Sequence, residues 1–582
     1  MTEMLENLRV EMQKRHICAY LIFNTDDHNS EYIPQDFMFV KALTGFTGDN
    51  AVVIVTENFA GLWTDSRFFL SGAQELENSG FTLKKDSSYT AFLKENIKPG
   101  STVGFSGGLI TAYKFLELKR KFSGINFLDV DLIEKVWKNR PKKKLTEIFS
   151  LEEKFSGESS MSKLSRLREK ISENGASYFL TSGLDDIAWC LNLRASDIDF
   201  CPVFRSFLAV EKDKDAYLFI HENRLSNSQK EYLSSLGVKI CGYDSVYEFH
   251  KNIPENAALL LDTKTVNSRL YLSFTQKIID KPSPVQLMKA VKNSTELKNM
   301  RLSMIDDGLA LERFFFKFEK NLEEGVKMTE LSAAKMLLEE RQKSENFLFE
   351  SFECISAFNP HAAMPHFAPS EKDNLEIKKD GVYLVDSGGQ YFLGTTDVTR
   401  TIPTGKITED FARDYTLVLI GNINIAMQKF PEGTPGSHLD VLARQALWQY
   451  GLDFGHGTGH GVGYCLNCHE GPQAFSTSAA RNNAVAFLPG MIITDEPGFY
   501  KENCYGIRHE HILEVVESKT KGFLEFSVMT LCHIDTRPVK KELMTEAQIN
   551  FLNDYNKKVY ETLSPYLNES VREYLKKRTA PV

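Results

Sequence analysis

The sequence predicts two α/β domains in tandem, followed by a larger α+β domain. Short apolar strands alternate with amphipathic helices in the first half of the chain, and the order of elements around residues 17–76 recurs around residues 176–220. From Glu353 onward the pattern changes to short strands separated by turns rich in histidine, aspartate and glycine. The chain of 582 residues is roughly four times a typical single domain, so its length allows this division. We expect domains at residues 1–141, 142–284 and 285–582.

The composition is that of an ordinary globular protein, with 42% apolar and 25% charged residues. The net charge of −9 offers no electrostatic footprint for nucleic acid or an anionic membrane. The longest uninterrupted apolar run, Ile17–Phe23, is far shorter than the roughly 20 residues that cross a bilayer. We therefore expect no nucleic-acid partner and no membrane span.

The predicted location is the cytoplasm. Nine cysteines, an odd number scattered along a long chain, indicate reduced thiols. The first 16 residues lack the clean apolar core and the small-residue cleavage site of a signal peptide. They instead place apolar side chains at helical steps, which predicts a short amphipathic helix.

The elements of the two α/β domains follow from short apolar runs. In the first domain these predict strands at 17–23 and 51–55 and a helix near 68–76, and in the second domain they predict strands at 176–180, 207–210 and 216–220. The segments 140–144 and 157–162 have the composition of linkers, and a second break lies at 281–284.

The third domain begins with helices. Asn293 or Ser294 can cap a helix whose apolar side chains recur at steps of three, four or seven; they are Leu297, Met300, Met304, Leu311 and Phe315. A further helix is predicted at about 329–341, and a helical tail is predicted near 545–563.

Two aspartates mark a predicted hairpin. Val382–Asp386 forms a strand, Ser387–Gln390 supplies flexible residues, and Gly394–Arg400 resumes an extended pattern. Such a hairpin would bring Asp386 and Asp397 together on adjacent strands. A buried, unpaired carboxylate is costly and normally requires a cation, so the pair favours a metal site.

A glycine-rich segment, Phe454–Gly463, contains His456 and His460. It is not a phosphate loop, because no Gly-Lys-Ser/Thr ends it, and its glycines disfavour the helix of a zincin. We expect the glycines to let the backbone bend closely around a site.

The segment Cys465–His469 matches the haem-attachment pattern, but an export signal and a second pair for a zinc ribbon are both missing. Two small thiols packed in a strand are the favoured interpretation.

Two more carboxylates, Glu496 and Glu510, complete the pattern. Strand alternation places Arg508 and Glu510 on one face and His509 and His511 on the other. Four hard carboxylates and one imidazole suit a pair of divalent first-row ions, whose charges they would balance. The residues therefore predict a two-metal hydrolase site.

With these residues the chain resembles the pita-bread metallopeptidases, which include methionine aminopeptidase, prolidase and aminopeptidase P. The order and surroundings of Asp386, Asp397, His460, Glu496 and Glu510 are similar to the metal ligands of that family. The segments most similar to the long, three-domain cytosolic aminopeptidase P are 63–67, 284–293, 395–400, 456–463, 469–472 and 494–498. The resemblance covers the whole chain.

The resemblance implies two creatinase-like α/β domains followed by a pita-bread catalytic domain. It further implies an aminopeptidase that releases the residue before proline, with two divalent ions, manganese by preference, that share a bridging hydroxide. Glu496 would act as general base and then acid. His469 would contact the scissile carbonyl, His366 would bind substrate next to the first metal strand, and peptides with proline second would be the partners.

The resemblance assigns further residues to substrate binding, namely His456, Arg508 and the first-domain Arg67. It also implies a homodimer. The chain departs from the family pattern at Phe367, His509 and His511, and Phe367 lies where it can alter the pocket wall.

Two rival functions stay open. Prolidase would restrict the enzyme to dipeptides, and the three-domain length favours the aminopeptidase over it. A non-catalytic binding module of the same fold is the alternative from a different class, and the presence of all five ligand positions argues against it.

Overall fold

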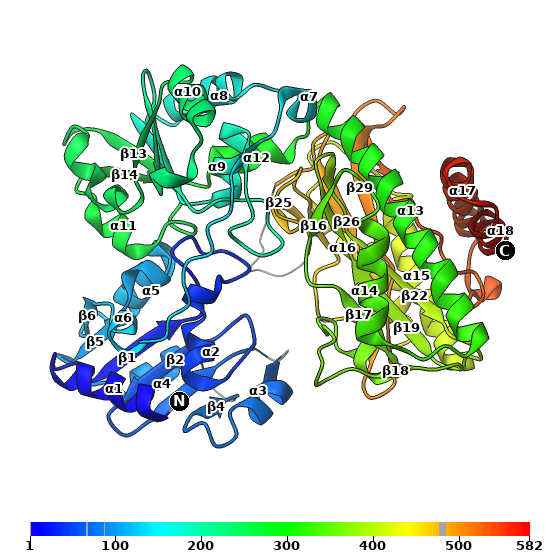
Figure 1. Cartoon of the computed structure of the whole chain (residues 1–582), viewed down its shortest axis with the longest axis horizontal. Helices are drawn as coiled ribbons and strands as arrows, with labels where there is room; N and C mark the ends of the chain where they lie inside the picture. The colour runs from blue at the N-terminus through cyan, green and yellow to red at the C-terminus, as the bar shows by residue number, and fades with distance from the viewer. Residues whose placement is uncertain (1, 66–67, 86–87, 477–484) are drawn as a thin grey trace. The chain divides into compact units, whose positions relative to one another are not determined.

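The computed structural model describes residues 2–65, 68–85, 88–476 and 485–582. The chain divides into two compact units (Figure 1). The first runs up to Ser150 and resumes at Ser159–Val285; the second contains Leu151–Glu158 and Gln286–Val582. The predicted domain boundaries at 141/142 and 284/285 stay predictions. No helix among the described residues is both long and apolar enough to cross a membrane.

The first unit contains two six-stranded mixed sheets with one shared topology. Their orders are β4-β3-β2-β1-β5-β6 and β12-β11-β10-β8-β13-β14. In each sheet the first three strands along the chain pair antiparallel, and the remaining pairs are parallel. This repeat confirms the prediction of two related α/β domains in tandem.

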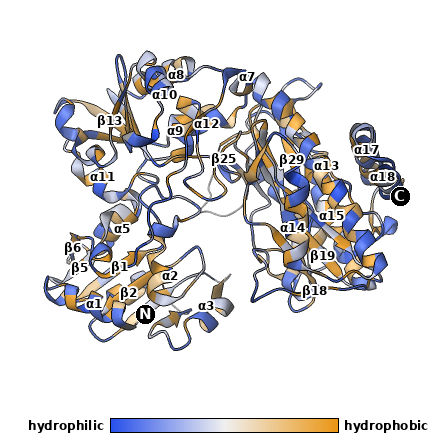
Figure 2. Cartoon of the chain, viewed as in Figure 1, coloured by the Kyte–Doolittle hydropathy of each residue, from blue (hydrophilic) through white to orange (hydrophobic). Residues whose placement is uncertain are grey.

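The strands of the first sheet are β1 (Ala19–Phe23), β2 (Val52–Thr56), β3 (Ala60–Trp63), β4 (Thr82–Lys84), β5 (Thr102–Phe105) and β6 (Asn126–Asp129). Those of the second are β8 (Tyr178–Thr181), β10 (Phe207–Glu211), β11 (Ala216–Ile220), β12 (Val238–Gly242), β13 (Ala258–Leu261) and β14 (Lys277–Asp280). A short ribbon joins β7 (Phe149–Ser150) to β9 (Leu193–Arg194). The central strand β1 is apolar and buried along its whole length, which Figure 2 shows as a hydrophobic stretch.

Helices accompany both sheets of the first unit. With the first sheet go α1 (Thr2–Gln13), α2 (Phe39–Thr44), α3 (Phe69–Glu75), α4 (Tyr89–Asn96), α5 (Ala112–Lys121) and α6 (Ile133–Val136). With the second go α8 (Ser160–Glu173), α9 (Leu184–Leu191), α10 (Asn227–Ser235) and α11 (Ser268–Ser273). Helix α12 (Pro284–Ala290) begins where the second break was predicted.

The predicted linker at 157–162 is wrong in its second half. The Ser159 side chain accepts a hydrogen bond from the backbone N–H of Ser162 and so caps helix α8, which begins at Ser160. The preceding segment belongs to the second unit, where Leu151 is buried and Asn299 donates to the Phe155 carbonyl oxygen at 3.0 Å. Small polar residues therefore act here as a helix cap.

The second unit begins with the long helix α13 (Ser294–Glu324), which starts with a capping box between Asn293 and Glu296. Of the predicted apolar stripe, Met300, Met304, Leu311 and Phe315 are buried. The other helices are α7 (Glu153–Ser156), α14 (Glu330–Arg341), α15 (Glu409–Ala426), α16 (Asp440–Trp448), α17 (Glu546–Leu563) and α18 (Glu569–Arg578). The predicted helices at 329–341 and 545–563 are thus confirmed within a residue.

Small sheets build the remainder of the second unit. One has the order β23-β30-β29-β26-β24-β25, another β17-β19-β22, a third β16-β20-β21, and the pairs β15/β18 and β27/β28 complete it. Their bounds are β15 (Met328–Thr329), β16 (Phe347–Glu350), β17 (Ile355–Phe358), β18 (Glu376–Ile377), β19 (Val382–Ser387), β20 (Gly389–Tyr391), β21 (Gly394–Thr395), β22 (Val398–Pro403), β23 (Lys429–Pro431), β24 (Gly459–Gly461), β25 (Glu470–Phe475), β26 (Ile492–Asp495), β27 (Gly498–Lys501), β28 (Tyr505–Arg508), β29 (His511–Glu517) and β30 (Phe523–Val528). Apolar side chains of α15, α16, α17, β26 and β29 share one core.

The two halves of the first unit meet at a buried ion pair. Arg205, 1% exposed, precedes β10 and donates to Asp36 of the first half, with Nη1 3.0 Å from Oδ2. Its Nη2 also lies 3.8 Å from Asp27 Oδ1. The Tyr243 hydroxyl donates to Asp27 Oδ2 at 2.5 Å. Arg205 is thus the positive charge that faces two buried carboxylates from the other half.

We expect Arg205→Ala to lower the free energy of unfolding by about 3–5 kcal/mol, since it leaves Asp36 and Asp27 buried without their cation. The matched control is Lys239→Ala, which breaks an exposed ion pair with Asp215 in the same unit. Such pairs contribute about 1 kcal/mol or less. Urea unfolding followed by circular dichroism measures both changes. Equal, small losses for the two variants would show that the buried pair does not stabilise the unit.

Candidate metal centre

Two aspartates reach the centre from one hairpin. Strand β19 carries Asp386 near its end, and Asp397 lies directly before β22, which pairs with β19 in a register that sets Asp386 opposite Thr399. Oxygen atoms of Asp386, Asp397 and Glu510 lie within 4.8 Å of one another, and all three residues are buried. The hairpin predicted around Asp386 and Asp397 therefore exists and brings both carboxylates together.

The other predicted ligand residues approach from the large sheet. His460 lies on β24, Glu496 follows β26, and Glu510 lies between β28 and β29. The His460 Nε2 atom is 3.5 Å from Asp397 Oδ2 and 3.4 Å from Glu496 Oε1. Potential ligand atoms of His460, Glu496 and Glu510 also lie within 4.8 Å of one another. The five residues predicted from the sequence thus meet in one place.

The glycines beside His460 permit this approach. A Cβ atom on Gly459 would lie 1.9 Å from the Thr494 carbonyl oxygen, and one on Gly461 would lie 2.2 Å from the Glu470 carbonyl oxygen. Only glycine lets β24 run this close to its neighbours. Gly459–Gly461 forms the short strand β24, and no helix is present at 454–463, as expected from the glycines.

Burial raises the pKa values of three of the four carboxylates, Asp386, Glu496 and Glu510. Burial, and then the Asp397 charge, raise the pKa of Glu510 well above its ordinary value. Burial is also the main cause that raises the pKa values of Asp386 and Glu496. The Asp386 Oδ1 atom is buried and has no hydrogen-bond partner among the described residues. Crowded hard oxygens of this kind, together with one imidazole, fit divalent cations.

Hydrogen bonds with neutral groups orient three of the five predicted metal ligands. The His460 Nδ1–H donates to the Gly461 carbonyl oxygen at 2.9 Å, which leaves Nε2 as the lone-pair nitrogen that faces the carboxylates. The Thr399 hydroxyl donates to Glu510 Oε2 at 2.8 Å. The Cys468 thiol donates to Asp397 Oδ2 at 3.2 Å. These contacts fix the orientation of three of the five residues without neutralising them.

Cys465 and Cys468 lie in the loop between β24 and β25 and not in a strand, so that part of the prediction is wrong. Both are buried and neither forms a disulfide bond, as expected for reduced thiols. Cys465 adopts a positive φ of 46°, which a strand does not allow. The loop thereby directs the Cys468 thiol to a metal-centre carboxylate, which is a contact that the spacing of the cysteines does not reveal.

A chain of hydrogen bonds extends from Asp386 to His456. Arg508 Nη2 donates to Asp386 Oδ2 at 2.6 Å, and its Nη1 donates to the Tyr500 hydroxyl at 2.6 Å. The Tyr500 hydroxyl lies 2.7 Å from His456 Nε2, whose Nδ1 lies 2.8 Å from the Gly457 carbonyl oxygen. Tyr500 therefore donates to a neutral His456. Sequence reasoning missed Tyr500, whose only signal is its place four residues after Glu496.

The remaining predicted site residues lie in different settings. His469 is exposed, and its ring centroid is 4.4 Å from that of His460. Its ring also offers a nitrogen within 4.8 Å of ligand atoms of Asp397 and His460. His366 is exposed and close enough to His456 to act on its charge. Arg67 lies outside the described residues.

The three departures from the family pattern are all buried against other rings. His509 is buried against Tyr415, with ring centroids 4.4 Å apart, and His511 is buried against Tyr555 at 4.7 Å. This is the face that strand alternation predicts for both histidines. Phe367 is buried and stacks on His361 with centroids 4.1 Å apart.

Comparisons with known proteins agree along the whole chain. Profiles described as creatinase/prolidase N-terminal domain match residues 4–136 and 139–296. The profile of metallopeptidase family M24 matches residues 298–517, and that of the C-terminal region of peptidase M24 matches residues 522–582.

The similar proteins include curated relatives and a solved structure. A probable Xaa-Pro aminopeptidase P of Coprinopsis cinerea is 36% identical over 100% of this chain and 98% of its own. Xaa-Pro aminopeptidase 1 of Dictyostelium discoideum is 35% identical over 99% and 96%. The crystal structure of an X-prolyl aminopeptidase from Caenorhabditis elegans superposes with a TM-score of 0.93, at 33% identity over 100% of this chain and 99% of that one. The worm protein is described as a cytosolic enzyme with a di-nuclear active site.

We expect His456 to make the metal-free protein less stable in acid. Burial, and then the charge of Arg508, lower the pKa of His456 to about 3, whereas an unfolded histidine titrates near 6.5. Between these values the unfolded state binds more protons, so stability falls as the pH falls below about 6.5. Because the imidazole keeps some contact with water, His456→Gln should reduce the loss between about pH 7.5 and pH 5 by only about 1 kcal/mol.

Urea unfolding at the two pH values measures this difference. His438→Gln, which replaces an exposed histidine of the same unit, is the control and should leave the pH dependence close to that of the unmodified chain. If His456→Gln retained the full acid sensitivity, the neutral state assigned to His456 would be wrong.

Proposed function

The chain belongs to metallopeptidase family M24, and we propose that it is a two-metal aminopeptidase that releases the N-terminal residue from peptides with proline second. The observation that carries this proposal is the convergence of Asp386, Asp397, His460, Glu496 and Glu510 within one buried centre. The Xaa-Pro aminopeptidases, which are similar over their full length, support the choice of reaction and substrate. The di-nuclear site of the worm enzyme supports a pair of ions.

The residues that would hold two ions are these five. Manganese is the proposed metal, because carboxylate oxygens with a single imidazole suit hard divalent first-row cations. When bound, the ions would supply an activated water and polarise the scissile carbonyl. Neutral hydrogen-bond partners orient three of these residues: Cys468 donates to Asp397, Thr399 donates to Glu510, and the Gly461 carbonyl oxygen accepts from His460.

Glu496 is the proposed proton carrier. Its side chain is 19% exposed, which makes it accessible from the substrate side while it still borders His460. It would take a proton at its carboxylate from the attacking water and pass it to the proline nitrogen that leaves. His469, exposed beside His460, is proposed to donate a hydrogen bond to the oxyanion of the tetrahedral intermediate.

The proline side of the site is proposed to consist of His366, His456, Tyr500 and Arg508. Proline contributes a fixed ring and an amide without an N–H. Since Arg508 and the neutral His456 are already satisfied through Tyr500, they offer no acceptor to an ordinary amide N–H at that position. A substrate with another second residue would bury an unpaired donor, which costs about 1–3 kcal/mol. A role for Arg67 in substrate binding stays a prediction from the resemblance.

Cytoplasmic location and a homodimer are parts of the same proposal. The worm relative is described as cytosolic, and none of the nine cysteines forms a disulfide bond in the described structure. Prolidase is the less supported rival: a Xaa-Pro dipeptidase from Bacillus anthracis shares the fold, but at 22% identity and a TM-score of 0.52 over 65% of this chain. A non-catalytic module is disfavoured by the complete set of five ligand residues.

The substrate class is tested with Arg-Pro-Pro, Arg-Pro and Arg-Ala-Ala in the presence of manganese. We expect rapid release of arginine from Arg-Pro-Pro and little from Arg-Ala-Ala, because only the first presents proline with further chain beyond it. Chromatography of the released amino acid provides the rates. Cleavage of the dipeptide alone would identify a prolidase, and efficient cleavage of Arg-Ala-Ala would identify a general aminopeptidase.

Glu496→Gln should lower kcat by at least the roughly 10²–10⁴-fold that is typical when a general acid–base group is lost. The change keeps the size of the side chain but removes its proton acceptor. Steady-state kinetics on Arg-Pro-Pro measures the effect, and Glu502→Gln, an exposed carboxylate nearby in the chain, is the control. Near-normal turnover of Glu496→Gln would assign proton transfer to a different group.

A further inference from the structure

A buried arginine, Arg400, lies next to the metal centre and forms no ion pair with a carboxylate of the described residues. Arg400 follows Thr399 on β22 and is 1% exposed. Among the described residues, its five hydrogen bonds go to four backbone carbonyls and one hydroxyl. A guanidinium has five donors in a rigid fork, so this environment satisfies all of its bonding capacity.

The contacts of Arg400 join two segments that are distant in sequence. On one side, Nη1 donates to the carbonyl oxygens of Glu510 at 2.6 Å and of Thr399 at 2.9 Å. On the other side, Nε donates to the His533 carbonyl oxygen at 3.0 Å, and Nη2 donates to the Cys532 carbonyl oxygen at 2.7 Å. Arg400 therefore holds the backbone of Glu510 and also the loop that contains Cys532 and His533, which is called the C-terminal loop below.

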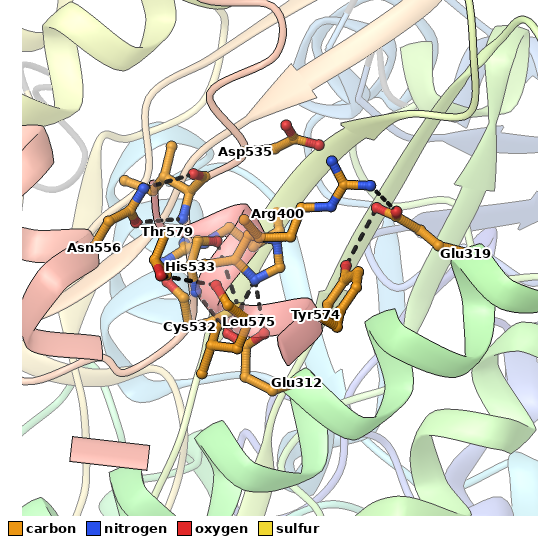
Figure 3. A network of polar contacts seen from close by, with 12 residues as sticks. Glu312, Glu319, Arg400, Cys532, His533, Asp535, Asn556, Tyr574, Leu575 and Thr579 are labelled. Atoms are coloured by element: carbon orange, nitrogen blue, oxygen red, sulfur yellow. Dashed lines mark hydrogen bonds and ion pairs between the residues drawn. The ribbon is translucent and has the colours of Figure 1, made fainter. Parts of the chain in front are cut away.

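The C-terminal loop is itself fixed on both sides. Glu312 of α13 accepts from the backbone N–H of His533 at 2.8 Å and lies 2.8 Å from its Nδ1. Asn556 of α17 exchanges two hydrogen bonds of 3.0 Å with the backbone of Ile534. Arg400, Glu312, Cys532 and His533 lie together in Figure 3, with Asn556 beside them. The loop thus offers Arg400 a rigid anchor.

Tyr555 of α17 completes the anchor. Its hydroxyl accepts from Arg400 Nη2 at 2.8 Å and lies 2.7 Å from the Cys532 carbonyl oxygen. Its ring packs on His511, the residue next to Glu510. Glu510 is in turn bound to β22 at three points. Its N–H donates to the Thr399 carbonyl oxygen at 3.2 Å, its carboxylate accepts from the Thr399 hydroxyl, and its carbonyl oxygen accepts from Arg400. The position of Glu510 is therefore defined against β22 and, through Arg400, against the C-terminal segment.

We propose that Arg400 is a positioning residue through which the C-terminal loop and helix α17 set the position of Glu510 and thereby the affinity for the metal pair. The inference rests on the proposed function, since it assigns Glu510 to the metals. Its physical basis is that a guanidinium has five N–H donors in a fixed plane. Arg400 can therefore hold five neutral acceptors from both segments at once. A lysine keeps the charge but has three donors at one point and cannot span both segments.

The test measures metal affinity directly, by titrating manganese alone into the metal-free full-length chain in a calorimeter. We expect Arg400→Lys to weaken binding of at least one ion by about 10–100-fold, the usual effect of losing a partner behind a ligand. Tyr555→Phe removes one acceptor of Arg400 and touches no metal-centre residue, and we expect a several-fold weakening. Circular dichroism verifies that each variant is folded.

Arg194→Lys is the matched control. Arg194 is also 1% exposed and donates to backbone carbonyl oxygens, of Ala188 at 2.6 Å and of Leu193 at 3.1 Å, but it lies in the first unit. We expect it to lower stability and leave manganese affinity unchanged. Equal losses of affinity in Arg194→Lys and Arg400→Lys would overturn the proposal.

The other outcomes are equally distinct. Folded Arg400→Lys with unchanged manganese affinity would overturn the proposal, and if that variant does not fold, unchanged affinity in Tyr555→Phe would do so. Failure of the unmodified chain to bind two manganese ions would instead contradict the proposed function. The two ideas therefore fail by different measurements.

Discussion

The second unit depends on one electrostatic constraint, which is the repulsion among four carboxylates held in one buried place. Burial raises the pKa values of Asp386, Glu496 and Glu510, so it disfavours their ionised forms. What opposes the repulsion is backbone pairing, because the ladders of β19 with β22 and of β26 with β29 are independent of side-chain charge. The sheets therefore supply the stability that the centre itself lacks.

The side chains around the centre show how orientation is obtained without neutralisation. Thr399, Cys468 and the Gly461 carbonyl each make one hydrogen bond to a proposed metal ligand, namely Glu510, Asp397 and His460. None of the three groups carries a charge. Such contacts fix a rotamer or a tautomer while the negative charge stays available for a cation. Asp386 is the exception, because its Oδ2 atom forms an ion pair with Arg508 at 2.6 Å. The neutral contacts therefore orient the crowded carboxylates and the imidazole, and the negative charge of the site is retained.

Local sequence patterns predicted the order of the domains and the five metal-centre residues. The features that these patterns did not predict depend on contacts between residues far apart in the sequence. The repeated α/β order and the order of Asp386, Asp397, His460, Glu496 and Glu510 are visible in the sequence because each depends on neighbours within a strand or turn. Tyr500 was missed because its importance comes from two partners, His456 and Arg508, that a spacing does not reveal. Segment 151–158 is likewise held from across the chain, by Asn293 and Asn299, and a local pattern does not reveal these contacts.

Arg508 gives the two sides of the centre a shared support. It donates to Asp386 Oδ2, which leaves Oδ1 as the oxygen without a partner among the described residues and so the one available to a cation. The same guanidinium holds Tyr500, and through it His456, on the side proposed for proline. A shift of Asp386 toward a bound ion must therefore move or strain the hydrogen bonds that shape the proline side. In the proposed function, Arg508 would therefore couple metal binding to substrate selection, because it contacts both Asp386 and Tyr500.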